Sequence, residues 1–220
     1  MKPELILAPS MLSADFKNLS EEIKAVEKGG AAYLHIDVMD GVFVPSISFG
    51  MPVMKSIRSA TNMVFDAHLM IIDPIRYIKE FAASGADLIT FHLEAAQDPQ
   101  AVIDEIRNCG CKAGISIKPG TPFEDVIPYM DKVDMLLIMT VEPGFGGQKL
   151  IPETVDKVRA LRAFVTAEGL DTDIEVDGGI TEGNISDIVK AGANVVVAGS
   201  AVFKGNAKEN TARLMDLIRL

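Results

Sequence analysis

The sequence predicts a parallel α/β barrel of eight strand–helix units, the (β/α)8 or TIM-barrel fold. Short apolar runs alternate with longer amphipathic segments along all 220 residues, which gives about 27 residues per unit. Most of the short runs are nearly all apolar, as is typical of parallel strands covered on both faces. The segments EKGGAAYLHI, AASGADLITFH and VKAGANVVVAG each place a glycine between the end of a predicted helix and the next predicted strand.

The predicted strands and helices alternate along the chain. We expect strands at Leu5–Ala8, Tyr33–Ile36, Val64–Ala67, Leu88–Phe91, Ala113–Ile117, Met135–Met139, Asp173–Val176 and Val195–Ala198. We expect helices in the intervening segments Leu19–Lys28, Pro74–Ala83, Pro99–Asn108, Pro152–Glu168 and Ile185–Ala191. In the first of these helices, Leu19, Ile23 and Val26 recur at three- and four-residue steps and form one apolar stripe.

A doubly wound open sheet is the alternative fold for the same alternation. A dinucleotide-binding fold of that kind has a G-x-G-x-x-G motif after its first strand, and this sequence does not. No linker, low-complexity segment or block of charge separates a second domain. We therefore expect one barrel domain over residues 1–220.

The composition argues against several classes of protein. Because 21 basic and 31 acidic side chains leave a net charge of −10, we expect no nucleic-acid partner. No apolar run reaches the roughly 20 residues of a membrane span, and the N-terminal stretch is too short for a secretory signal. Cys109 and Cys111 are too few for a disulfide framework and indicate reduced thiols in a cytoplasmic protein.

Polar side chains gather at the C-terminal ends of three predicted strands, where barrel active sites form. HIDVMDG places His35 and Asp37 on one face of the second strand, FDAHLM places His68 on the third, and IEVDGG places Asp177 on the seventh. Imidazole and carboxylate ligands suit a divalent ion such as Zn, Fe, Mn or Co. A hydrogen-bonded polar pair in the barrel mouth is the structural alternative for His35 and Asp37.

Glycine-rich segments follow the last three predicted strands. The loops after strands seven and eight, with a short helix N-terminus, form the usual phosphate site of this fold. Their backbone N–H groups would hold a phosphate without a basic side chain, whereas simple tight turns are the alternative explanation. The substrate-binding candidates in these segments are Gly144, Gly146, Gly147, Gln148, Gly178, Gly179, Gly199 and Ser200.

Several other residues lie at the same end of the predicted barrel. Ser10 follows the first strand and is placed to bind a substrate hydroxyl. Met39, Met70 and Met139 are candidates for the pocket wall, although methionine in a barrel more often fills the core. His92 ends the fourth strand, either as a pocket residue or as a structural hydrogen-bonding group.

Taken together, these motifs resemble the ribulose-phosphate 3-epimerase family. APSMLSADF, HIDVMDGVFVPSISFG, FDAHLM, MTVEPGFGGQ, EVDGGI and AGSAVFKG keep the family's order from about Leu7 to Gly205. The resemblance implies a ribulose-phosphate binding barrel that interconverts D-ribulose 5-phosphate and D-xylulose 5-phosphate in the pentose phosphate pathway. It also suggests a homo-oligomer.

The resemblance further implies roles for individual residues. His35, Asp37, His68 and Asp177 would hold one divalent metal ion, with zinc favoured, and no organic cofactor is expected. Asp37 and Asp177 would also act as acid and base through an enediolate, while Ser10, His68 and Asp177 would contact the sugar phosphate. The glycines after strands six to eight would hold its phosphate.

Three alternative functions remain open from the sequence. A D-allulose 6-phosphate 3-epimerase would share the metal motifs, although PGFGGQ and VDGGI match the pentose pattern better. A metal-free decarboxylase or synthase would carry a lysine in a D-x-K-x-x-D run, but the comparable stretch from Asp37 to Asp40 has none. A non-catalytic phosphosugar-binding barrel would not need both Asp37 and Asp177.

Overall fold

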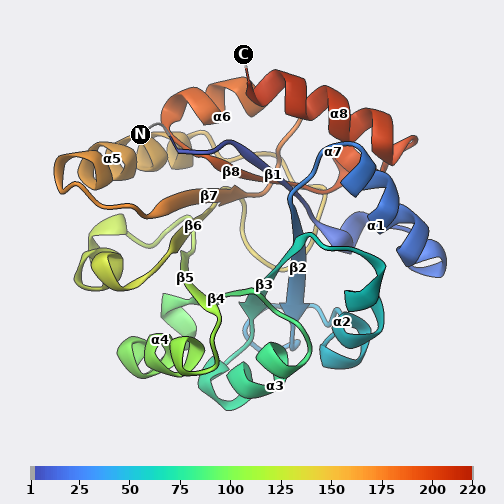
Figure 1. Cartoon of the computed structure of the whole chain (residues 1–220). Helices are drawn as coiled ribbons and strands as arrows, with labels where there is room; N and C mark the ends of the chain where they lie inside the picture. The colour runs from blue at the N-terminus through green and yellow to red at the C-terminus, as the bar shows by residue number, and fades with distance from the viewer. Residues whose placement is uncertain (1–2, 220) are drawn as a thin grey trace.

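The computed structural model describes residues 3–219, over which eight strands form one parallel sheet in the order β1-β8-β7-β6-β5-β4-β3-β2. Their bounds are β1 Ile6–Pro9, β2 Tyr33–Met39, β3 Val64–Met70, β4 Leu88–His92, β5 Lys112–Ile117, β6 Met135–Met139, β7 Asp173–Asp177 and β8 Val195–Ala198. A parallel bridge between Ser10 and His35 joins β1 to β2 and closes the ring (Figure 1). The predicted (β/α)8 barrel is confirmed.

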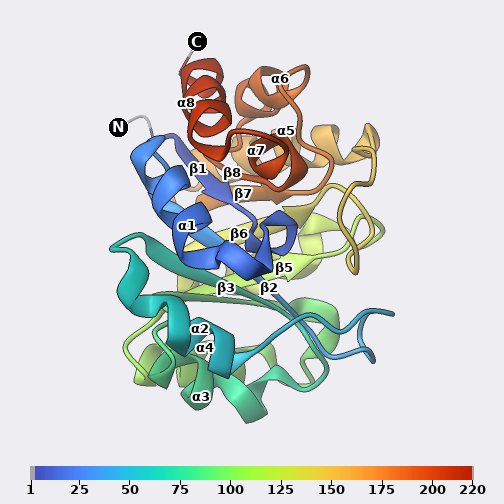
Figure 2. The ribbon, with the colours of Figure 1, turned by 90° about the vertical axis from the view of Figure 1, so that its right-hand side faces the viewer.

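Helices surround the strands on the outside of the ring (Figures 1 and 2). Their bounds are α1 Leu19–Lys28, α2 Met51–Ile57, α3 Ile78–Ala83, α4 Pro99–Asn108, α5 Glu153–Ala167, α6 Ile185–Ala191, α7 Ser200–Phe203 and α8 Ala207–Ile218. The predicted bounds of α1, α4 and α6 are confirmed, whereas α2, α7 and α8 were not predicted. No helix within residues 3–219 is long and apolar enough to cross a membrane.

Two connections differ from regular α-helices. The segment predicted as a helix over Pro74–Ala83 begins as a 3-10 turn, η4 (Pro74–Tyr77), before α3 starts. Between β5 and β6 the chain forms a 3-10 helix, η6 (Phe123–Lys132), which contains Pro128. Proline lacks the backbone N–H that an interior helical position donates, which disfavours a regular α-helix at this point.

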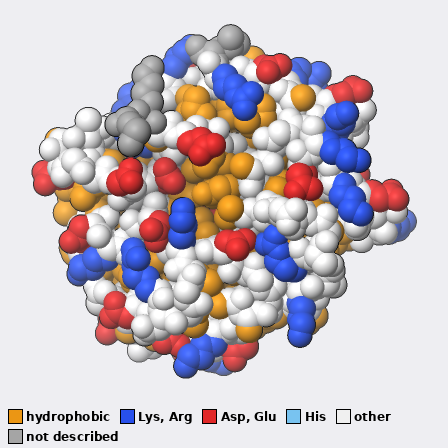
Figure 3. Space-filling model, viewed as in Figure 1, with side chains coloured by type: hydrophobic (Ala, Val, Ile, Leu, Met, Phe, Trp, Pro, Cys, Tyr) orange, Lys and Arg blue, Asp and Glu red, His pale blue; other side chains and the backbone are white. Residues whose placement is uncertain are grey.

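The strands bury both of their faces. Outward-facing side chains such as Leu34 and Phe65 belong to the large core beneath the helices. Inward-facing side chains form a second apolar cluster, made of Ile6, Ala8, Tyr33, Leu88, Met135, Val195 and Val197. Figure 3 shows apolar side chains gathered at the centre of the face seen in Figure 1, with charged side chains scattered around them.

Further along the strands, the barrel interior becomes polar. His35, Asp66, Thr90, Ser116 and Glu175 are all fully buried. Burying polar and charged groups is costly unless they are paired, so this layer is not explained by stability alone. It forms the base on which the candidate site is built.

Residues Lys118–Thr121, between β5 and η6, are held by two oppositely charged side chains. Glu94 follows β4, and its carboxylate accepts hydrogen bonds from the Lys118 N–H (2.8 Å) and the Thr121 hydroxyl. Lys157 of α5 donates to the carbonyl oxygens of Pro119 (2.7 Å) and Thr121. Burial alone would raise the pKa of Glu94, but hydrogen bonds from His92, Lys118 and Thr121 lower it to about 2.

We expect Glu94→Gln to lower the free energy of unfolding by about 1–2 kcal/mol at pH 7, because a charged acceptor of several hydrogen bonds is lost. A carboxyl group with a depressed pKa stabilises the fold above its ordinary value of 4.5, and that stabilisation disappears as the pH falls toward about 2. Urea unfolding of both proteins should therefore give a smaller difference at pH 3 than at pH 7. An equal difference at the two pH values would contradict this role.

Candidate active site

A cavity of about 510 Å³ lies at the C-terminal ends of the strands. Every predicted substrate-binding residue except His68 lines it: Ser10, Met39, Met70, Met139, Gly144, Gly146, Gly147, Gln148, Asp177, Gly178, Gly179, Gly199 and Ser200. His68 is fully buried and does not line the cavity. Other lining residues that the sequence argument missed include Leu12, Ser13, Val141, Lys149 and Asn184.

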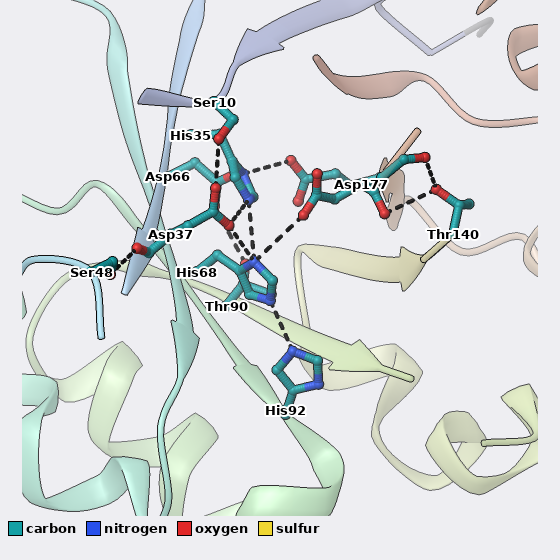
Figure 4. Close-up of polar contacts among 12 residues, drawn as sticks. Ser10, His35, Asp37, Ser48, Asp66, His68, Thr90, His92, Thr140 and Asp177 are labelled. Atoms are coloured by element: carbon teal, nitrogen blue, oxygen red, sulfur yellow. Dashed lines mark hydrogen bonds and ion pairs between the residues drawn. The ribbon is translucent and has the colours of Figure 1, made fainter. Parts of the chain in front are cut away.

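The four predicted metal ligands come together at this end of the barrel. The register of β2 against β3 places Asp37 opposite His68, and one donor atom from each of His35, Asp37, His68 and Asp177 lies within 4.8 Å of the others (Figure 4). Asp37 Oδ1 is 3.1 Å from His68 Nδ1 and 3.3 Å from His35 Nε2. These two imidazole nitrogens are 3.3 Å apart, and Asp177 Oδ2 is 4.0 Å from His68 Nδ1.

The three separations among His35, Asp37 and His68 fit a small divalent ion, whereas Asp177 lies somewhat farther away. A tetrahedral ion with bonds of about 2.0–2.1 Å sets its ligand atoms about 3.3 Å apart. Two imidazole nitrogens and two carboxylate oxygens are ligands that zinc and related ions accept. The cluster can therefore hold a metal ion through His35 Nε2, His68 Nδ1 and one oxygen from each aspartate.

The second nitrogen of each imidazole faces a buried partner. His35 Nδ1 is 2.7 Å from Asp66 Oδ2 and 3.4 Å from Glu175 Oε1. His68 Nε2 is 2.9 Å from Nε2 of His92, which is fully buried and does not line the cavity. Metal-binding histidines are usually oriented by such partners. The structural role considered for His92 therefore agrees with its position.

Asp66 and Glu175 are not among the predicted site residues, although their spacing from the predicted ligands points to them. Asp66 lies two residues before His68, and Glu175 lies two residues before Asp177. Residues two apart on a strand share a face, so the alternation that predicts the ligands also points to these acids. Burial and the nearby charge of Asp66 raise the pKa of Glu175 well above its ordinary value.

The two carboxyl groups beside the cavity differ in proton affinity. Burial would raise the pKa of Asp37, but the charge of His35 and hydrogen bonds from His35 and His68 hold it well below its ordinary range. Ser10 Oγ also donates to Asp37 Oδ2 at 2.6 Å. Burial, followed by the charge of Asp37, raises the pKa of Asp177 to about 6. Asp177 therefore binds a proton more readily than Asp37 does.

The glycine-rich loops form the other side of the cavity. Gly178 and Gly179 have positive φ angles of 122° and 69°. A Cβ atom would come within 2.4 Å of the Val141 side chain at Gly178, and within 2.2 Å of the Leu150 nitrogen at Gly179. Only glycine therefore fits both the backbone conformation and the space. The close approach brings the loop after β7 against the segment that follows β6.

Comparison with known proteins gives a consistent family assignment. Residues 6–203 match the model of the "Ribulose-phosphate 3 epimerase family". A ribulose-phosphate 3-epimerase from Synechocystis is 47% identical over 92% of this chain and 89% of its own length. The Bacillus subtilis ribulose-phosphate 3-epimerase is 46% identical over 90% of this chain and 91% of its own.

Solved structures with much lower identity share the fold. A tryptophan synthase α-subunit variant from Pyrococcus furiosus superposes with a TM-score of 0.73 at 16% identity and covers both chains completely. KGPDC from Streptococcus mutans gives 0.72 at 14% identity, over 99% of this chain and 98% of its own. These likenesses concern the barrel alone. Because the family match and the identities near 47% extend over about nine-tenths of the chain, the protein belongs to the ribulose-phosphate 3-epimerase family of isomerases.

Proposed function

We propose that the protein interconverts D-ribulose 5-phosphate and D-xylulose 5-phosphate by inverting the carbon next to the ketone. The observation that carries this proposal is the pair of carboxyl groups, Asp37 and Asp177, which line the same cavity. They come from β2 and β7, on different sides of the ring (Figure 4). Inversion needs a base on one face of the carbon and an acid on the other.

In one direction, the ionised Asp37 takes the proton from C3 of the sugar, and the electron pair forms an enediolate with the neighbouring carbonyl. Asp177 then delivers its proton to the opposite face of C3. The two carboxyl groups have now exchanged protonation states, so they exchange roles for the reverse reaction. Proton exchange with water returns them to their starting states.

We propose zinc as the metal, held by His35, Asp37, His68 and Asp177. When bound, the ion would act as a Lewis acid that stabilises negative charge developing on the sugar oxygens. Support comes from the nitrogen and oxygen ligand set and from the separations among His35, Asp37 and His68, which are close to the tetrahedral value.

The sugar phosphate would sit with its phosphate against the glycine-rich loops. Gly178, Gly179 and Gly199 bring the backbone close to the cavity, where N–H groups can donate to phosphate oxygens. Lys149 also lines the cavity and offers a cation that the sequence argument did not include. Both features allow an acidic protein to bind a small anion.

A homo-oligomer, a cytoplasmic location and one domain over residues 1–220 stay predictions. Among the relatives, an Oryza sativa protein is named a cytoplasmic isoform and an Arabidopsis thaliana protein is named chloroplastic. Light scattering of the purified protein measures the number of chains in the assembly.

Replacing Asp37 or Asp177 by Asn should lower kcat for epimerisation by about 100- to 10,000-fold, because each variant lacks one proton-transfer group. The assay follows both epimers in D2O, where the parent protein should place deuterium at C3. Metal content is measured in parallel, since both residues are proposed ligands. Asp173→Asn, which alters a carboxyl group at the other end of β7, is the matched control and should keep parental kcat. Near-parental epimerisation by Asp177→Asn would contradict the assignment.

Removing divalent ions with a chelator should abolish epimerisation, and adding Zn²⁺, Fe²⁺, Mn²⁺ or Co²⁺ singly should restore it to different extents. Rates are compared on D-ribulose 5-phosphate and D-allulose 6-phosphate, and we expect the pentose to be preferred. A faster rate on the hexose phosphate would identify the protein as a D-allulose 6-phosphate 3-epimerase instead. Substrate binding without epimerisation or deuterium exchange, whichever ion is added, would instead identify a non-catalytic binding protein.

A further inference from the structure

A chain of three side chains leads from the metal cluster to the rim of the barrel. His68 Nε2 lies 2.9 Å from His92 Nε2, and His92 Nδ1 lies 3.3 Å from Glu94 Oε2 (Figure 4 shows the first two residues). Both imidazoles are fully buried. The Phe43 ring, whose centroid is 4.8 Å from that of His92, packs against the middle of the chain.

This arrangement permits one set of proton positions when an ion is bound. His68 Nδ1 faces the cluster and must present a lone pair, so the proton of this ring lies on Nε2. His92 Nε2 must then accept that proton in a hydrogen bond, which leaves the proton of the second ring on Nδ1. Glu94 accepts it. Because an ionised carboxylate accepts and never donates, Glu94 sets the direction of the whole chain.

We propose that His92 and Glu94 are positioning residues that fix the tautomer and ring orientation of His68, and thereby set how tightly the site holds a divalent ion. This inference rests on the metal site of the proposed function. Neither residue lines the cavity, so neither is placed to touch the substrate. Their effect on catalysis would pass through His68.

The two metal-binding imidazoles are thus held in different ways. His35 contacts a buried carboxylate, Asp66, directly at 2.7 Å. On its Nε2 side, His68 is connected to a carboxylate, that of Glu94, only through His92. The Glu94 side chain is 23% exposed at the rim of the barrel. Glu94 is in turn fixed by the Lys118 N–H and the Thr121 hydroxyl. The proposed metal site is therefore linked through His92 and Glu94 to the loop between β5 and η6. The direct contact between His35 and Asp66 makes no such link.

The test compares Zn²⁺ affinity, measured by chelator competition, among four variants of the full chain. His92→Leu leaves the buried His68 N–H without an acceptor and should weaken Zn²⁺ binding by about 10- to 100-fold. His92→Gln offers an acceptor toward His68 and a donor toward Glu94, and should restore affinity to within a few-fold of the parent. Glu94→Ala should weaken binding in the same direction as His92→Leu.

Ser116→Ala is the matched control. Ser116 pairs with His92 in the register of β4 and β5, is fully buried, and its hydroxyl has no hydrogen-bond partner among the described residues. Removing that hydroxyl should leave Zn²⁺ affinity unchanged. Thermal unfolding of each metal-free variant checks its fold, and the visible spectrum of the Co²⁺-loaded protein reports whether the ligand field around His68 has changed.

Unchanged Zn²⁺ affinity in Glu94→Ala and in folded His92→Leu would overturn the proposal, as would a His92→Gln protein no better than His92→Leu. If His92→Leu does not fold, Glu94→Ala and His92→Gln decide the matter, because the first alters a partly exposed side chain and the second keeps both hydrogen bonds. A parent chain that binds no divalent ion would overturn both this inference and the metal site. A parent that binds Zn²⁺ without epimerising would refute only the proposed reaction.

Discussion

The parallel register between β2 and β3 is the constraint on which the site depends. It places His35 beside Asp66 and Asp37 beside His68, all with side chains inside a closed ring of strands. Charged groups in such a place are costly unless they are compensated. The imidazoles compensate Asp37 and Asp66, and a divalent ion would compensate the remaining negative charge near Asp177.

The proposed reaction depends on the unequal surroundings of two similar carboxyl groups. Contacts with His35 and His68 lower the pKa of Asp37, whereas burial and the charge of Asp37 raise the pKa of Asp177. Pairs of acids whose pKa values are pushed apart are a general way to obtain an acid and a base in one site. The fold contributes by delivering the two groups from separate strands into one cavity, where the sugar can lie between them.

The strands and ligands could be predicted from the sequence because their signals are local. Short, mostly apolar runs located all eight strands, and alternation within HIDVMDG and FDAHLM located three of the four candidate ligands. Other features depend on contacts between distant segments. His92 acquires its role only because β4 lies beside β3, and Lys149 joins the cavity only through the path of the loop after β6. Helix α8 is not among the predicted helices, although its apolar positions repeat regularly, because no proline marks its start and no glycine follows its end.

X-ray absorption spectroscopy of the zinc-loaded protein tests the central claim most directly, namely that this buried layer is built around one divalent ion. The account predicts one Zn²⁺ per chain with two imidazole nitrogens and at least two oxygens at about 2.0–2.2 Å. Sulfur scattering at about 2.3 Å, or a shell without imidazole, would place the ion elsewhere and contradict the account.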